Sequence, residues 1–333
     1  MARMAKRVLY HSGLLALARL ARTRGRAIVL RYHALTPDAS PVVYAAPDVC
    51  LSADAFRVQM AFVKRAYTVV PLDVLVDAVV RGGALPPRAL AITFDDGYAD
   101  NHRLGLPVLR ALGLPATVYV ATGATDGRAP FWVAAVRALA LGAPGDAVAV
   151  PGLDAVRLDG PGGREAAAKA LTRALVPLDA DVRAAAIAEA AARAGVDLVR
   201  ALAGTMLDWD AIRELAAAGW TIGAHTVTHS NVALLDPAHA EREIAGSRDA
   251  LATAIGRPVE HFCYPNSGGQ HAYFGDEVAR ALARLGFRSA TTSRPGAVRP
   301  GTNPYLMPRL GVTPRLAPVV ELAAAMERQR LAA

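Results

Sequence analysis

The stretch Leu90-Ala91-Ile92-Thr93-Phe94-Asp95-Asp96-Gly97-Tyr98 is an apolar run that ends in two adjacent carboxylates and a glycine. A buried strand rarely ends this way without a function, because an unpaired buried charge is costly. Successive side chains of a strand point to opposite faces, so Asp95 and Asp96 cannot do the same task from the same direction. The pair therefore suggests that one carboxylate holds a metal ion and the other moves a proton.

Apolar runs alternate with helical spacing along most of the chain. Strands are expected near residues 26–32, 90–94, 116–121, 220–224, 259–264, 287–291 and 306–312. Helices are expected near residues 52–65, 72–81, 107–112, 209–218, 237–255 and 276–285. This alternation predicts an α/β protein with a mostly parallel sheet. About seven such units with right-handed crossovers fit an incomplete (β/α) barrel or an open doubly wound sheet.

Two segments stand apart from this alternation. Alanine, arginine and glycine dominate from about residue 125 to residue 205, where we expect a helical insertion with one or two alanine-rich helices between Arg164 and Ala194. Residues 1–25 carry arginines around apolar positions and are expected to form an amphipathic helix, which packs on a membrane surface or on its own domain. Residues 26–333 are then one domain that the insertion interrupts.

Composition and charge narrow the class of protein. The chain of 333 residues has a formal net charge of +8, but no basic run interleaved with aromatics, so no nucleic-acid partner is expected. Every stretch of about 18 residues contains a charged residue or a histidine, so no transmembrane helix is expected either. Cys50 and Cys263 make no disulfide framework, and the N-terminus is a poor secretory signal. We therefore expect a cytoplasmic protein, with room for peripheral association at the inner face of the membrane.

Three polar clusters follow predicted strands, namely Asp95-Asp96, His225 with His229, and Tyr264-Pro265-Asn266. A barrel places the carboxyl ends of its strands on one face, where catalytic groups collect. Two histidines four residues apart and one carboxylate make a three-ligand metal site with a position open for water. Such a site lowers the pKa of water and polarises a carbonyl, and a second carboxylate nearby can take the proton of the water.

These residues resemble the motifs of the NodB-homology polysaccharide deacetylases, the metal-dependent carbohydrate esterases of family 4. Thr93-Phe94-Asp95-Asp96-Gly97 and His225-Thr226-x-x-His229 resemble the first two motifs. Four other segments also resemble motifs of this family, namely Tyr32-His33, Met206-Leu207-Asp208-Trp209-Asp210, Phe262-Cys263-Tyr264-Pro265-Asn266 and Pro308-Arg309-Leu310. Several separated motifs in the right order are hard to match by chance. The resemblance covers about Arg26 to Val312 and implies a distorted (β/α)7 barrel, but its motifs do not explain the insertion.

The resemblance also implies a set of site residues. It implies one divalent metal ion on Asp96, His225 and His229, with zinc expected first and cobalt, nickel, manganese or iron as alternatives. Asp95 would be the general base for the attacking water, and a backbone N–H near Tyr264, Pro265 and Asn266 would stabilise the oxyanion. The substrate would be an N-acetylated sugar in a glycan, a glycolipid or an exopolysaccharide intermediate, and the products acetate and a free amine.

The chain departs from the family pattern at two places. The third motif of the family usually supplies an arginine that orients the base, but Cys263 stands at that position, and Arg309 is our candidate substitute. The last motif often supplies a histidine as general acid, but no histidine follows His271. His33, after the first predicted strand, is our candidate for protonating the leaving group, and a subgroup that acts on poly-N-acetylglucosamine-like exopolysaccharides has a similar Tyr-His there.

Two other functions stay open at this stage. An amidohydrolase for a small non-sugar linear amide would use the same ligands, because a fold does not determine its substrate. A non-catalytic glycan-binding relative would explain the missing arginine and histidine. The intact Asp95, which a pure binder would not need, argues against that relative.

Overall fold

The computed structural model describes residues 25–127, 129–265 and 272–331. The amphipathic helix expected over residues 1–25 lies, except for Gly25, outside the described residues, and so does Asn266. Within the described ranges, no helix combines the length and the apolar character needed to cross a bilayer.

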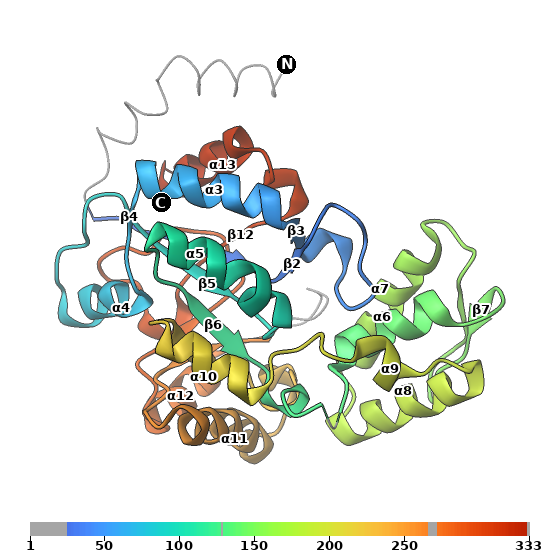
Figure 1. The fold of residues 1–333 in the computed structure, drawn as a ribbon. Helices are drawn as coiled ribbons and strands as arrows, with labels where there is room; N and C mark the ends of the chain where they lie inside the picture. Colours follow the sequence, from blue (N-terminus) through green and yellow to red (C-terminus); the bar gives the residue numbers. More distant parts are fainter. Residues whose placement is uncertain (1–24, 128, 266–271, 332–333) are drawn as a thin grey trace.

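A curled sheet of parallel strands forms the centre of the molecule (Figure 1). Its strand order is β11-β10-β9-β6-β5-β1-β12, and the short β4 pairs with the first half of β5. The strands are β1 (Ile28–Tyr32), β4 (Thr68–Val69), β5 (Ala89–Phe94), β6 (Thr117–Val120), β9 (Thr221–Ala224), β10 (His261–Cys263), β11 (Ser289–Thr291) and β12 (Leu310–Gly311). A parallel bridge joins Thr291, at the end of the edge strand β11, to Met307, which lies three residues before β12 at the other edge. The distorted (β/α)7 barrel expected from the sequence is therefore confirmed.

The register of β5 against its neighbour brings two of the expected site residues together. All six residues of β5 are buried, as expected for a parallel strand that is covered on both faces. The pairing of β5 with β1 runs from Ile28 opposite Leu90 to Tyr32 opposite Phe94. One residue further, the Asp95 N–H donates to the Tyr32 carbonyl at 3.0 Å. The strands thus end side by side, with His33 next to Asp95.

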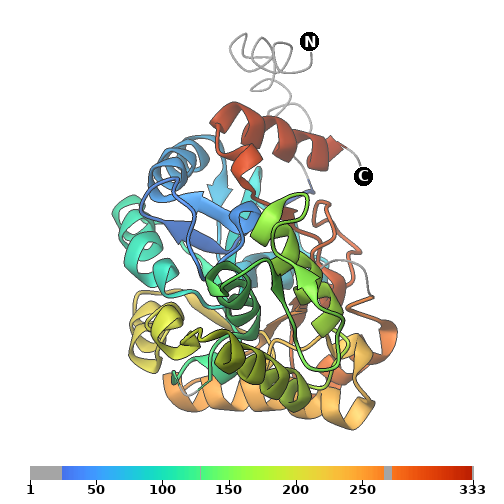
Figure 2. The same cartoon turned by 90° about the vertical axis from the view of Figure 1, so that its right-hand side faces the viewer.

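Helices cover the outside of the sheet (Figures 1 and 2). They are α3 (Ala53–Ala66), α4 (Leu72–Arg81), α5 (Leu106–Leu112), α10 (Trp209–Ala217), α11 (Pro237–Ile255), α12 (Asp276–Arg284) and α13 (Val319–Leu331). Ser52 caps α3 and Asp208 caps α10, each accepting a backbone N–H of the first turn. The sequence patterns did not predict α13, nor the small sheet of β2 (Ala34–Thr36) and β3 (Cys50–Ser52).

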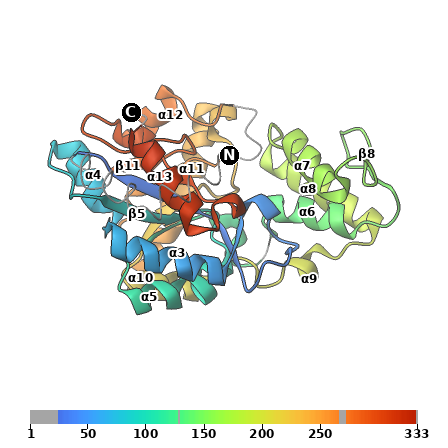
Figure 3. The ribbon, with the colours of Figure 1, turned by 90° about the horizontal axis from the view of Figure 1, so that it is seen from above.

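In the described residues between β6 and α10, a short 3-10 turn (Thr122–Ala124) is followed by four α-helices and a hairpin. The helices are α6 (Trp132–Gly142), α7 (Gly163–Leu175), α8 (Ala180–Ala194) and α9 (Leu198–Leu202), and the hairpin joins β7 (Ala147–Val148) to β8 (Val156–Arg157). They share an apolar cluster that includes Leu139, Leu171 and Ile187. Figures 1 and 3 show this group on one side of the barrel. We call α6 to α9 with the hairpin the insertion.

Candidate metal centre and catalytic site

The turn after β5 separates the two carboxylates of the opening stretch. Asp96 and Gly97 have φ angles of 74° and 85°, so the chain reverses as soon as the strand ends. A Cβ on Gly97 would lie 3.1 Å from Cγ1 of Val120 on the neighbouring strand, so both the conformation and the close approach favour glycine. Asp95 and Asp96 are both buried, and each has its own partners.

Asp96 forms a cluster of three metal-ligating groups with two histidines. Its Oδ1 lies 3.3 Å from His225 Nε2 and 3.2 Å from His229 Nε2, and all three residues are buried. One donor atom from each lies within 4.8 Å of the others. His225 Nδ1 donates to the Cys263 carbonyl at 2.7 Å, which leaves the Nε2 lone pair free for a metal. This O, N, N donor set fits a divalent ion such as zinc with an open position.

The ionisation of Asp96 agrees with the role of a ligand. Burial raises the pKa of its carboxyl, but the hydrogen bonds of His225 and His229, with the charge of His229, outweigh burial and hold the pKa well below its ordinary value. The group is therefore a carboxylate at neutral pH, as a metal ligand must be.

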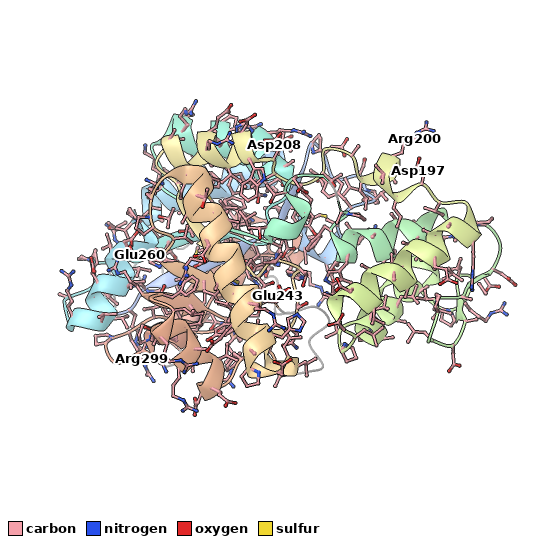
Figure 4. All side chains as sticks on the ribbon, turned by 90° about the horizontal axis from the view of Figure 1, so that it is seen from below. Asp197, Arg200, Asp208, Glu243, Glu260 and Arg299 are labelled. Atoms are coloured by element: carbon pink, nitrogen blue, oxygen red, sulfur yellow. The ribbon has the colours of Figure 1, made fainter. Side chains whose placement is uncertain are left out.

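The loop that carries the two histidines has a strained backbone. Thr226 and His229 have φ angles of 63° and 55°, which are uncommon for residues other than glycine. The buried Glu243 of α11 accepts hydrogen bonds of 2.9 Å from the N–H groups of Val227 and Thr228 and from the Thr228 hydroxyl. Three bonds to one carboxylate hold the loop in this conformation, so α11 fixes the spacing of the ligands (Figure 4).

Glu243 was missed in the sequence, although a pattern could have revealed it. The residues of α11 that are buried recur at helical spacing and form its inner face, namely Ala240, Glu243, Ile244, Ser247 and Leu251. A carboxylate on the apolar face of a helix needs a partner, because a buried unpaired charge is costly. The position of Glu243 on that face was therefore a sign that it binds something inside.

Replacement of Glu243 by glutamine is expected to weaken zinc binding by about 10- to 100-fold, the usual effect of losing a group that supports metal ligands. The amide has one acceptor oxygen in place of two, so it cannot hold all three donors of the loop. Competition with a chromophoric chelator measures the affinity. Glu241→Gln is the matched control, because Glu241 is on the same helix but pairs with Arg284 at the surface. If the Glu243→Gln variant bound zinc as tightly as the wild type, Glu243 would not be needed to hold the loop for metal binding.

The insertion contacts the same loop from the opposite side. Trp132 Nε1 donates to the His229 carbonyl at 3.4 Å, and the Phe131 ring meets the His229 ring edge-on at 5.0 Å between centroids. The buried guanidinium of Arg183 lies 4.3 Å from the centre of the Trp132 ring and donates to Ser230 Oγ at 3.2 Å. The position of His229 thus depends on α6 and α8 as well as on the barrel.

Asp95 is held by Arg309. The two Nη atoms of Arg309 donate to the two carboxylate oxygens at 2.6 and 2.7 Å, and the guanidinium is completely buried. Burial raises the pKa of the Asp95 carboxyl, but the charge and the hydrogen bonds of Arg309 outweigh burial and lower it to about 2. The same guanidinium donates to Cys263 Sγ at 3.0 Å. Arg309 therefore reaches Asp95 past the cysteine that replaces the motif arginine.

His33 lies beside this ion pair. Its Nε2 is 3.9 Å from Asp95 Oδ2. Burial lowers the pKa of the imidazole to about 4, with Arg31 lowering it further and Asp96 opposing. His33 is therefore neutral at neutral pH.

The residues after β10 are less suited to the role expected for them. The Tyr264 N–H donates to the Thr291 carbonyl at 3.2 Å, and Pro265 has no N–H. The Tyr264 N–H is thus engaged within the sheet, and a backbone oxyanion donor near these residues stays a prediction. Tyr264 lines the site cavity, and its hydroxyl donates to the Tyr305 carbonyl at 3.0 Å.

A cavity of about 400 Å³ opens above the site, and we call it the site cavity. His33, Asp95, Asp96, His225 and His229 all line it. Residues of α6 and α7 form another part of its wall, so the insertion encloses one side of the site. A larger cavity of about 650 Å³ lies between α9 and α10 and contains none of these residues.

Comparison with solved structures supports the fold described above. Among solved structures, the deacetylase PplD of Streptococcus pyogenes, in complex with acetate, matches with a TM-score of 0.59 and 17% identity over 89% of this chain and 96% of that chain. IcaB of Ammonifex degensii matches with a TM-score of 0.58 and 20% identity over 91% of this chain and 97% of that chain. At these identities the likeness shows the fold.

The sequence itself shows the family. No curated protein gives a significant match. The family model described as polysaccharide deacetylase matches residues 82–152 and 158–290, which is more than half of the chain and includes both the Asp95-Asp96 turn and the His225 to His229 loop. The chain therefore belongs to the polysaccharide deacetylase family.

Proposed function

We propose that the protein is a metal-dependent hydrolase that removes the acetyl group from an N-acetylated sugar of a glycan or glycolipid. The observation that carries this proposal is the pairing of a three-ligand cluster with a second, separately held carboxylate in one cavity. Membership of the polysaccharide deacetylase family supports the reaction class.

Asp96, His225 and His229 would hold the metal ion. A divalent ion bound there supplies Lewis acidity, which lowers the pKa of water and polarises the carbonyl of the acetamide. We propose zinc, because two imidazoles and one carboxylate make a common catalytic zinc site. Cobalt, nickel, manganese and iron suit the same donors and are alternatives.

Asp95 accepts the proton of the attacking water. Because Arg309 binds both oxygens, the plane of the carboxylate is fixed, and its low pKa keeps it ionised. A carboxylate with a pKa of about 2 is a weak base. Its contribution to the rate therefore comes mainly from position.

His33 carries a proton to the leaving amine. It is neutral, so one ring nitrogen has a free lone pair, and Nε2 lies 3.9 Å from Asp95 Oδ2. The proton that water loses to Asp95 can pass to this lone pair and from there to the nitrogen of the broken C–N bond. One proton of the water thus reaches the amine. The other leaves with the acetyl group as acetic acid, which ionises to acetate and releases that proton to solvent.

Arg309 also affects the choice between an enzyme and a glycan-binding protein. The absence of the motif arginine at Cys263 favoured a binding protein, but Arg309 supplies a guanidinium to the same carboxylate. A buried ion pair rarely adds stability by itself. The pairing of Arg309 with Asp95 beside the proposed metal site therefore favours an enzyme over a binding protein.

Acetate release tests the proposal. The substrates are N-acetylglucosamine, its oligomers and its 1-phosphate, and a small linear N-acetyl amide serves as the non-sugar comparison. We expect release from a sugar substrate, loss of release after treatment with a chelator, and recovery when zinc is added. Release that a chelator leaves unchanged would refute the metal site. Release from the linear amide alone would identify a non-sugar amidohydrolase, and glycan binding without release from any compound would identify a binding protein.

A further inference from the structure

Helix α7 of the insertion presents basic side chains to the site cavity. Lys169, Thr172 and Arg173 line the cavity and are three and four residues apart, so they lie on one face of the helix. They come from the insertion, whereas the metal ligands come from the barrel (Figure 3). The site motifs give no role to this face of α7.

The charge of this face is only partly neutralised. Lys169 pairs with Asp48 at 2.8 Å between Nζ and Oδ2. Arg173 is partly buried, and in the described part of the chain no carboxylate lies within 4.0 Å of its guanidinium. The other carboxylates that line the cavity are occupied, since Asp95 binds Arg309 and Asp96 belongs to the metal cluster. In the described part of the chain, Arg173 is therefore the cation of this face that no carboxylate neutralises.

Arg31 of β1 adds a third cation to the same cavity. Its Nη1 donates to Ser293, and a Cβ on Gly311 would lie 2.8 Å from its Nη2, so the glycine in β12 lets the guanidinium lie against that strand. Its Nε is buried, and among the described residues it has no hydrogen-bond partner. Buried polar groups nearly always find a partner. Arg31 also lines the site cavity, so a guanidinium with an unsatisfied donor stands at the cavity wall.

We propose that the site cavity contains an anion subsite, formed by Arg173 and Lys169 of α7 with Arg31 of β1, for a phosphate or carboxylate group on the N-acetylated sugar. That the anionic ligand is an N-acetylated sugar rests on the proposed function. The anion subsite itself does not depend on that function. Guanidinium groups bind both oxyanions through paired, charge-assisted hydrogen bonds. With a neutral sugar in the cavity, Lys169 would keep its pairing with Asp48, but Arg173 would have no anionic partner among the described side chains.

The first test measures anion binding without turnover. Inorganic phosphate is titrated calorimetrically into chelator-treated protein, so that a metal ion cannot bind it. We expect Arg173→Gln to weaken phosphate binding by about tenfold, the effect of losing one charge-assisted hydrogen bond. Arg173→Lys, which keeps the charge, should lose less. Arg110→Gln on the exposed side of α5 is the matched control and should bind like the wild type. Equal binding by the Arg173→Gln variant and the wild type would overturn the subsite.

The second test separates the sources of the anion. It compares N-acetylglucosamine 1-phosphate, the corresponding uronic acid and neutral N-acetylglucosamine as substrates of the zinc-loaded enzyme. We expect a higher kcat/KM for one anionic sugar, and an anionic-to-neutral ratio that falls about tenfold in Arg173→Gln through KM. The preferred anion identifies phosphate or carboxylate. Preference for the neutral sugar would overturn the proposal, whereas Arg173-dependent phosphate binding with no deacetylation would support the subsite and refute the proposed function.

Discussion

Replacing Asp95 with asparagine is expected to lower kcat for acetate release by about 10²- to 10⁴-fold, the contribution usual for a positioned acid–base group. Asparagine keeps the shape of the side chain but cannot accept the proton of the attacking water. The three proposed ligands, Asp96, His225 and His229, are unchanged in this variant. The variant should therefore bind zinc and substrate but turn over very slowly.

The measurement pairs this variant with a replacement of its neighbour. Steady-state kinetics and zinc affinity are measured for Asp95→Asn and for Asp96→Asn. The first should lose rate and keep zinc, whereas the second should lose both, since Asp96 is a ligand in the cluster. A kcat of the Asp95→Asn variant close to the wild-type value would show that Asp95 is not the general base.

Replacing Arg309 with methionine is expected to destabilise the fold by about 3–5 kcal/mol at neutral pH, the usual cost of breaking a buried pair. The carboxylate of Asp95 is 3% exposed and would be left without its cation. The double replacement Asp95→Asn with Arg309→Met should be less destabilised than the sum of the single variants, because it leaves no buried charge. Urea unfolding of the four proteins measures these differences. A single variant within about 1 kcal/mol of the wild type would contradict the buried pair.

The same replacement reverses the effect of pH through Asp95. In the wild type the folded-state pKa is about 2, below the unfolded value, so the stabilisation is present above an unfolded pKa of about 3.9 and is lost as pH falls toward 2. Without Arg309, burial dominates and raises the folded-state pKa, so the variant loses stability as pH rises above about 3.9. The acidic limb of its kcat/KM profile should move to higher pH, because Asp95 must be ionised to act.

Much of the site could be predicted because its residues follow strands. Strand ends in a parallel barrel meet at one rim, so Asp96, His225 and His229 could be grouped before any coordinates were available. The structure places the Nε2 atoms of both histidines within 3.3 Å of Asp96 Oδ1. His33 could be placed at the end of the first strand, but its distance from Asp95 depends on the register of β1 and β5.

Long-range contacts limited what the sequence could predict. Glu243 and Arg183 contact the ligand loop from helices whose docking no local pattern encodes. The sequence could not show that the Tyr264 N–H pairs with the Thr291 carbonyl at the end of β11, because this pairing depends on how the sheet curls. Alanine-rich helices were expected in the insertion, but alanine marks no face strongly enough to show that α7 turns Arg173 toward the site.

The path of Arg309 bears on how members of the family should be sorted into active and inactive chains. Its guanidinium contacts the Thr292 carbonyl, Cys263 and Asp95, which follow or end three different strands of the curled sheet. A charge needed at the centre can therefore be delivered from more than one strand. A family survey that required an arginine at the alignment position of Cys263 would classify chains with cysteine there as inactive. A survey that asks whether any strand end delivers an arginine to the base would retain them.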